Sequence, residues 1–147
     1  MIVFRGMLPD EDGLPQIGNT ASRLGARPGY AEDEVDQEDR IRSGDYIRPD
    51  IRIDANGLVQ PGTGGISTAL RQIDNLPPHR RPPKHGGDDE RYEVYELETD
   101  DLPDELRERI DPHGPTRHVF IEPAREMSFE AYQQALHSTR ALWRPVR

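Results

Sequence analysis

The stretch at residues 61–65, with the sequence Pro-Gly-Thr-Gly-Gly, constrains the fold more than any other part of the chain. Three glycines in four positions allow positive φ angles and close backbone approach, because no Cβ stands in the way. Ser67 and Thr68 follow, and since either hydroxyl can cap a helix, we expect a short helix over residues 67–73. A glycine loop followed by two hydroxyls suits a ligand that carries sugar or phosphate groups. The alternative is an ordinary glycine turn before a capped helix. A Walker lysine and the dinucleotide-fold glycine spacing are both missing from the stretch.

The rest of the composition predicts a small core with long loops. Hydrophobic residues make up 33% of the 147 residues, and there are 14 Pro and 13 Gly. That length suits a single domain over residues 1–147. The absence of cysteine excludes disulfides, thiolate zinc sites and cysteine nucleophiles, and it fits action in a reducing cytoplasm. No apolar run is long enough to cross a membrane, and the first residues do not form a cleavable signal peptide.

Charge is distributed unevenly along the chain. Residues 88–111 carry 12 acidic and 3 basic residues, so this segment alone accounts for the net charge of −9. A second acidic run covers residues 32–39, and basic residues gather at 79–85 and near the end of the sequence. This pattern excludes a broad cationic surface for nucleic acid. Most of the basic residues are arginine, whose planar guanidinium suits forked contacts to phosphate or carboxylate.

Hydrophobic periodicity predicts an α+β domain with short strands, few helices and long loops. Strands are expected at residues 2–4, 46–54, 92–97 and 117–123, with Pro49 placing the second of these at a sheet edge. A short helix is expected near residues 18–24 and another over 102–110, where apolar residues recur four apart. The longest helix is expected to begin after Ser128 as its N-cap and to run to about Trp143. Residues 7–45 and 75–87 are expected to be mostly irregular.

Individually, the polar candidates have ordinary structural explanations. Arg5 at a strand end is typical of an ion-pair residue. His118 is typical of a histidine in the core or at a sheet edge with its hydrogen bonds satisfied, and Glu122 of a strand-end carboxylate that faces water. The histidines lack metal-ligand spacing, since His113 and His118 are five apart across an expected turn, and we predict no metal site. Ser67 has no nucleophile-elbow context, and the sequence holds no ordered Ser/His/Asp set.

The combination of these residues is more specific than any one of them. A first strand ending in Phe4-Arg5-Gly6, a central Gly-Ile-Ser-Thr and a late strand bearing an acid follow the order of the Arg–Ser–Glu pattern of ADP-ribosyltransferases. More closely, the chain resembles the type-six-exported effector-two family, small bacterial cytotoxins with an ADP-ribosyltransferase-like fold. The most specific block is Gly-Leu-Val-Gln-Pro-Gly-Thr-Gly-Gly-Ile-Ser at residues 57–67. Supporting blocks stand at residues 3–6, 48–51, 102–106 and 118–127, while the acidic segment 31–39 lies outside the resemblance.

The resemblance implies NAD as the ligand. It implies that Arg5 forks onto a phosphate or ribose of NAD, where a planar guanidinium can make two parallel hydrogen bonds. Ser67 and Thr68 would brace the nicotinamide ribose, while the backbone at Gly64 and Gly65 would reach the carboxamide.

Further roles follow for aromatic and acidic residues. Tyr92 or Tyr95 would stack on the nicotinamide ring, and His118 would join the cofactor-binding residues. Cleavage of the glycosidic bond develops positive charge that a carboxylate stabilises. Glu122 is the first choice for this catalytic acid and Glu126 the second, although no Glu-x-Glu or Gln-x-Glu pair stands at the late strand.

These implications give a leading function and two alternatives. The leading one is a bacterial cytotoxin that binds NAD, transfers ADP-ribose to a target in the cytoplasm, reaches it through a dedicated secretion system, and is neutralised by a cognate immunity protein. The first alternative is a toxin of the same fold that acts on RNA, with His118, Arg125 and the pair Arg80 and Arg81 as contacts. The second is a non-enzymatic module whose acidic strip at residues 88–111 binds a basic partner.

Overall fold

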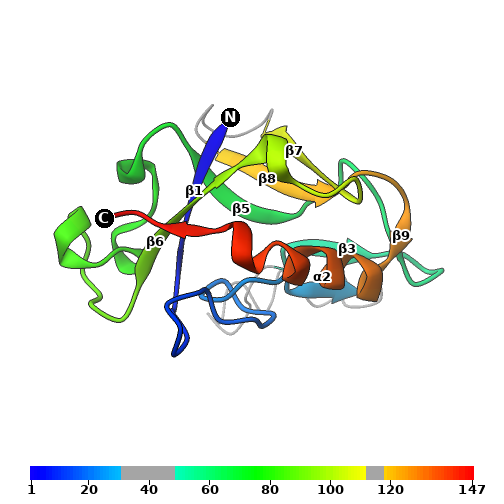
Figure 1. Cartoon of the computed structure of the whole chain (residues 1–147). Coiled ribbons are helices and arrows are strands. Elements are labelled where there is room, and N and C mark those ends of the chain that lie inside the picture. Colours follow the sequence, from blue (N-terminus) through cyan, green and yellow to red (C-terminus); the bar gives the residue numbers. More distant parts are fainter. Residues whose placement is uncertain (31–48, 112–117) are drawn as a thin grey trace, which may run out of the picture.

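A computed structural model describes residues 1–30, 49–111 and 118–147 of the chain. Its main element is a six-stranded antiparallel sheet with the strand order β10-β6-β1-β5-β8-β7 (Figure 1). The strands are β1 (Ile2–Met7), β5 (Ile66–Leu70), β6 (Glu93–Glu98), β7 (Leu106–Ile110), β8 (His118–Pro123) and β10 (Arg144–Pro145). The earliest strand in the sequence therefore lies in the interior of the sheet, between β6 and β5.

Two small sheets and one long helix complete the described fold. β2 (Pro28–Tyr30) pairs in parallel with β3 (Ile51–Ile53), and β4 (Leu58–Val59) pairs with β9 (Met127–Ser128). The α-helix α2 (Phe129–Ser138) follows β9 directly, and Figure 1 shows it running beside β3. Short 3-10 turns lie at Ile73–Asn75, Pro78–Arg80, Pro83–His85, Thr99–Asp101 and Arg140–Leu142.

One main core joins the large sheet to these elements. From the sheet it takes buried residues such as Val3, Ile66 and Ile121, and from α2 it takes Tyr132 and Leu136. Because the other face of the sheet is also partly buried, the apolar residues of β1, β5 and β8 do not alternate strictly with polar ones. A smaller cluster on the opposite face is built from Ala69, Leu76 and Val94.

The predicted α+β architecture with short antiparallel strands is confirmed. The strands expected at 2–4, 92–97 and 117–123 appear as β1, β6 and β8, and residue 117 lies outside the described part. Of the strand expected at 46–54, Ile51–Ile53 forms β3, and residues 46–48 lie outside the described part. The N-cap at Ser128 is confirmed, since its Oγ accepts a hydrogen bond from the N–H of Ala131 at 3.1 Å.

Three helix predictions were wrong. Residues 67–73 form β5 and a turn, because Thr68 is buried and donates its hydroxyl to the carbonyl of Val119 at 2.8 Å instead of capping a helix. Residues 102–110 form a turn and β7, because Arg107 and Arg109 alternate along a strand so that both reach Glu122. Residues 18–24 form turns joined by the bridge between Ile17 and Leu24. The long helix ends at Ser138, with a 3-10 turn in place of its last expected turn. Residues 75–87, expected to be irregular, hold short 3-10 turns, and the whole stretch 31–45 lies outside the described residues.

Candidate active site

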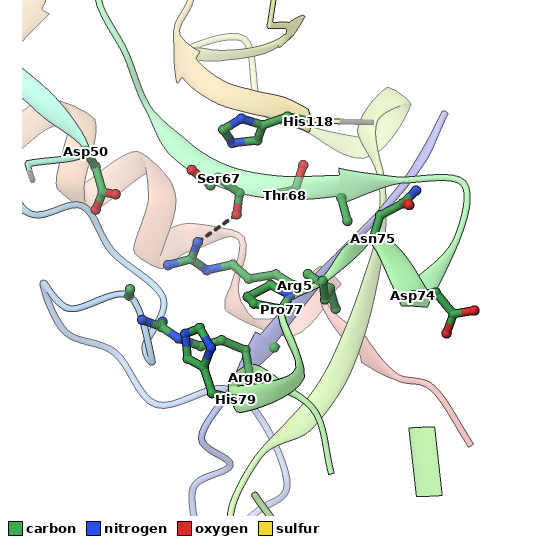
Figure 2. Close-up of a pocket in the computed structure, with 14 residues that line it drawn as sticks. Arg5, Asp50, Ser67, Thr68, Asp74, Asn75, Pro77, His79, Arg80 and His118 are labelled. Atoms are coloured by element: carbon green, nitrogen blue, oxygen red, sulfur yellow. Dashed lines mark hydrogen bonds between the residues drawn. The ribbon is translucent and has the colours of Figure 1, made fainter. Parts of the chain in front are cut away.

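The candidate site lies where β1 and β5 separate. β1 pairs with β6 along its whole length, from Ile2 to Met7, but it pairs with β5 only at Val3 and Phe4. Arg5 is the next residue, so its side chain stands at the point where the two strands part. Its Nη1 donates to the Ser67 carbonyl on β5 at 2.8 Å (Figure 2), which closes the gap between the strands. Its Nη2 donates to the Arg23 carbonyl at 3.0 Å.

Arg5 is a buried cation without a carboxylate partner. Its exposed fraction is 4%, and no ion pair joins it to an acid in the described part of the chain. Its Nε is buried and has no hydrogen-bond partner there. Burial lowers the pKa of the guanidinium, and the nearby Asp50 carboxylate partly opposes this shift. In the described part of the chain carbonyl groups alone hold this buried charge, which is costly, so an anionic ligand at this position would be stabilised.

A cavity of about 580 Å³ opens beside Arg5. This volume lies within the usual range of small-molecule sites. Cationic and titratable side chains dominate its polar lining, with Asp50 and Asp74 as the acids (Figure 2). The charged and hydroxyl residues that line it are Arg5, Asp50, Ser67, Thr68, Asp74, His79, Arg80 and His118.

The segment after β5 carries His79 and Arg80 to the cavity. Arg81 organises this segment from inside, since its side chain is buried and its Nε donates to the Leu76 carbonyl at 3.0 Å. The segment packs directly on β1, because a Cβ at Gly6 would lie 1.9 Å from the Arg80 carbonyl oxygen. Glycine directly after Arg5 is therefore required for the cavity wall to close over the strand.

His118 borders the cavity from β8. Its Nδ1 lies 3.3 Å from an oxygen of Asp111, and its ring packs against Phe120 with centroids 4.6 Å apart. Thr68 also lines the cavity, although its hydroxyl is occupied by the Val119 carbonyl. His118 and Arg80, two of the residues considered for RNA contact, thus share the cavity with Arg5. Arg81 is buried in its own segment, and Arg125 is not a lining residue.

Glu122 does not line this cavity. Its side chain is fully buried, with Oε1 accepting from Arg107 Nε at 2.8 Å and Oε2 accepting from Arg109 Nε at 2.9 Å. The backbone N–H of Gly62 donates to Oε2 at 2.7 Å. Burial raises the pKa of this carboxyl, but the hydrogen bonds from Arg109, Gly62 and Arg107 outweigh it, and the net shift is downward. The geometry is that of a structural ion cluster between β7, β8 and the glycine loop.

Comparison with protein-family models matches residues 6–143 to the family described as Tse2 ADP-ribosyltransferase toxin. The chain belongs to this family. The match covers nearly all of the sequence and begins directly after Arg5, so the other lining residues lie within it. No curated protein matches the chain. Membership in the Tse2 ADP-ribosyltransferase toxin family implies NAD as a substrate, and a cavity with a buried arginine suits a ligand that carries phosphates.

Two negative findings apply to the described residues of this Tse2-family toxin. Among them, no helix is long and apolar enough to cross a membrane. No group of three or more histidine and acidic side chains in the described ranges is placed to hold a metal ion.

The glycines of the central block contact protein and are absent from the cavity lining. A Cβ at Gly64, where φ is +136°, would lie 2.3 Å from the Asp50 carbonyl oxygen. A Cβ at Gly65 would lie 2.4 Å from the Ile121 carbonyl oxygen. Both positions therefore need glycine so that neighbouring backbone segments can pack closely, which is a different use from the predicted contact with a carboxamide.

The other predicted site residues also lie apart from the cavity. Tyr95 is fully buried in the main core, and its hydroxyl donates to the Gly13 carbonyl at 2.9 Å. Burial raises the pKa of Tyr95 to about 12. Tyr92 is buried and does not line the cavity. Glu126 is exposed and accepts a hydrogen bond from Gln60 at 2.7 Å.

Of the predicted site residues, the structure thus brings Arg5, Ser67, Thr68 and His118 together. Sequence reasoning did not select Asp50, His79 or Arg80 for the NAD site. Asp50 stood in one of the blocks that carry the family resemblance, and His79 and Arg80 stood in the basic cluster at 79–85. Those signals were visible, but nothing in the sequence showed that either segment folds against Arg5.

Proposed function

We propose that this toxin binds NAD in the cavity beside Arg5 and transfers ADP-ribose to a macromolecular target in the cytoplasm of an intoxicated cell. The observation that supports it best is the buried Arg5 guanidinium, which two carbonyls fix where β1 and β5 separate and whose Nε has no partner among the described residues. Such a group is preorganised for an anion, because its orientation is set before any ligand arrives.

The residues around the cavity suggest a division of roles in NAD binding. Arg5 and Arg80 would bind phosphate or ribose oxygens, since arginine forms forked, charge-assisted hydrogen bonds with such groups. Ser67 is exposed, and its carbonyl is engaged by Arg5, so its hydroxyl is available for a ribose. His118 and His79 border the same space and would contact the sugar or the base.

The family also suggests a cellular context. Because the activity would harm the producing cell, we propose a cognate immunity protein that neutralises the toxin by covering the cavity. We further propose delivery by a dedicated secretion system into a competing bacterium. The net charge of −9 gives such a partner a strongly acidic surface to recognise, with residues 88–111 as its densest part.

Inducible expression in bacteria tests the toxin assignment. Wild type is expected to stop growth, whereas Arg5→Ala and Ser67→Ala are expected to restore it. Arg91→Ala is the matched control, because Arg91 is exposed and pairs only with the neighbouring Asp89 in the described chain. If wild type grows like an empty-vector strain, the toxin assignment is wrong.

Purified protein tests the enzymatic part. Wild type is expected to bind NAD in titration calorimetry and to label a bacterial lysate with biotinylated NAD, and Arg5→Ala to do neither. Separating labelled protein from labelled RNA identifies the acceptor class. RNA that is damaged without NAD, with loss of the damage in His118→Ala, would favour the RNA-directed alternative.

A further inference from the structure

Transfer of ADP-ribose needs a carboxylate at the cavity, and Glu122 is not available for this role. Positive charge develops on the ribose as the glycosidic bond breaks, and a nearby acid stabilises it. The oxygens of Glu122 are already bound by two arginines and a backbone N–H. The acids that line the cavity within the described residues are Asp50 and Asp74.

Asp74 is poorly placed for this task. Its side chain is 84% exposed, and Figure 2 shows its carboxylate pointing away from Arg5. It lies 3.6 Å from Nη1 of Arg81, at the outer rim. Because the Asp74 carboxylate stands in solvent, its charge is screened and contributes little to a reaction inside the cavity.

Asp50 has the geometry that Asp74 lacks. Its Oδ2 accepts a hydrogen bond from the Arg27 N–H at 2.7 Å, which fixes the carboxylate plane. Its Oδ1 has no hydrogen-bond partner among the described residues, and no arginine in that part of the chain forms an ion pair with it. Figure 2 shows the carboxylate on the same side of β5 as the Arg5 guanidinium. One oxygen is therefore anchored, while the other has no hydrogen-bond partner within residues 1–30, 49–111 and 118–147 and belongs to a residue that lines the cavity.

The glycine block explains how Asp50 comes to this position. The Gly65 N–H donates to the Asp50 carbonyl at 2.8 Å, and the Asp50 N–H donates to the Arg27 carbonyl at 2.9 Å. Any side chain at Gly64 would collide with that same Asp50 carbonyl. The most specific sequence block of the chain thus holds Asp50 beside the start of β5, where Ser67 also stands. Gly64 and Gly65 can therefore serve the site by positioning Asp50, without contacting the ligand themselves.

We propose that Asp50 is the catalytic carboxylate of the transfer, opposite Arg5 and beside Ser67. In the reaction, the bond between ribose C1′ and the nicotinamide nitrogen breaks, and its electron pair leaves with nicotinamide. A new bond forms from C1′ to the acceptor nucleophile, whose proton is released to Asp50 and then to water. The Asp50 carboxylate stabilises the positive charge at the ribose between these two events. This inference rests on the proposed function.

A purely structural role would give Asp50 different behaviour. Its charge opposes the lowering of the Arg5 pKa by burial, so it could serve only as a counter-charge for the guanidinium. In that case its removal would affect folding or NAD binding, while a catalytic role affects turnover at constant binding. Burial raises the pKa of Asp50, with the Arg27 N–H and Arg5 opposing the shift.

The test compares Asp50→Asn, Asp50→Glu and Asp74→Asn in the full chain. Asparagine keeps an oxygen for the Arg27 N–H, so the fold is expected to survive, which circular dichroism and thermal melting check. We expect Asp50→Asn to bind NAD in calorimetry within about threefold of wild type, and to release nicotinamide at least about 100-fold more slowly, the usual scale for loss of one transition-state contact. Asp50→Glu is expected to recover part of that rate, and Asp74→Asn to stay within about threefold of wild type.

Each outcome bears on a different part of the proposal. Asp50→Asn turnover within threefold of wild type would overturn the assignment, and so would parallel loss of NAD binding and turnover, which marks a counter-charge. If wild type neither binds NAD nor releases nicotinamide, the proposed function fails and the assignment fails with it. If wild type is active and Asp50→Asn keeps full turnover, the proposed function stands and only the assignment is lost.

Discussion

Replacing Glu122 by glutamine separates structural from catalytic use of the late-strand acid. The carboxylate has no exposed surface and accepts three hydrogen bonds, two of them from arginines on β7. A glutamine amide has one accepting oxygen, and its NH₂ group would face either Arg107 Nε or the donors from Arg109 and Gly62. One donor would therefore meet another donor, and two arginines would lose their counter-charge.

The expected loss can be estimated from burial. Removing one partner of a fully buried ion pair costs about 3–5 kcal/mol. Here Arg107 is 49% exposed and Arg109 25% exposed, so water takes over part of the lost interaction. We therefore expect about 2–3 kcal/mol of lost stability. For a domain of this size that corresponds to a fall in Tm of about 5–10 °C.

Thermal melting and urea unfolding of Glu122→Gln measure this loss. Glu126→Gln is the matched control, since it makes the same change at an exposed carboxylate on the same segment and is expected to melt within about 1 °C of wild type. The pH dependence has a definite sign. The folded pKa of Glu122 is lowered below its ordinary value of 4.5, so its stabilisation is present above that pH. The difference between wild type and Glu122→Gln is expected to shrink as the pH falls through the folded pKa.

A specific result would refute this reasoning. A Glu122→Gln protein that melts with wild type at pH 7, but binds NAD and no longer turns it over, would show that Glu122 acts in the reaction. The inferred ion cluster would then contribute little to folding, and the assignment of the acid to Asp50 would lose its main premise.

Three further substitutions test the packing around the site. Tyr132→Phe removes a buried hydroxyl that donates to the Ile121 carbonyl at 2.6 Å and accepts from the Ile66 N–H at 3.2 Å, so urea unfolding is expected to show a loss of about 1–3 kcal/mol; an unchanged midpoint would contradict these bonds. Gly65→Ala places a Cβ 2.4 Å from the Ile121 carbonyl oxygen, so we expect the free energy of unfolding to fall by about 2 kcal/mol or more and the Tm by several degrees. An unchanged Tm would show that β5 and β8 are less closely packed. Arg71→Gly relieves a φ of +72° and is expected to raise the free energy of unfolding by about 0.5–1 kcal/mol; a loss would mean that the Arg71 side chain makes contacts worth more than the strain.

Much of the sheet could be predicted from the sequence, because several strands carry their own local signal. Residues 92–97 alternate in polarity and residues 118–123 are apolar and end at a proline, and both became strands. Ser128 indicated the start of α2, because a hydroxyl before an apolar helical stripe is a local capping signal. These elements depend on residues close in sequence, which a single chain displays directly.

The errors arise where a distant partner decides the structure. The spacing of Leu102, Leu106 and Ile110 fits a helix equally well, and β7 forms because Arg107 and Arg109 pair with an acid on β8. Ser and Thr after the glycine block suggest a cap, but cross-strand pairing with β8 makes them part of β5. Tertiary context overrides local propensity in both cases.

In the candidate site, too, local sequence signals identify some residues, while contacts between distant segments decide the position of others. The order of residues along the chain indicates Arg5 and Ser67, the family resemblance adds His118, and all three line one cavity. The sequence does not predict the position of Asp50, because that position depends on contact between the Asp50 carbonyl and the backbone of Gly64 and Gly65, with β3 and β4 between them in the chain. The position of Glu122 on the late strand indicates a catalytic acid, but Arg107 and Arg109, which bind its carboxylate, come from residues 102–110, where the sequence predicts a helix.

The interior place of β1 in the sheet has a consequence for how this toxin gains and loses its activity. Both strands that pair with β1 come from more than 60 residues further along the chain, so the sheet around Arg5 forms only after long segments have closed. Pairings of that separation carry a large loop-closure cost before any contact stabilises them. A partly threaded or partly unravelled chain would carry the arginine without the cavity, and such intermediates would be harmless to the cell that makes them.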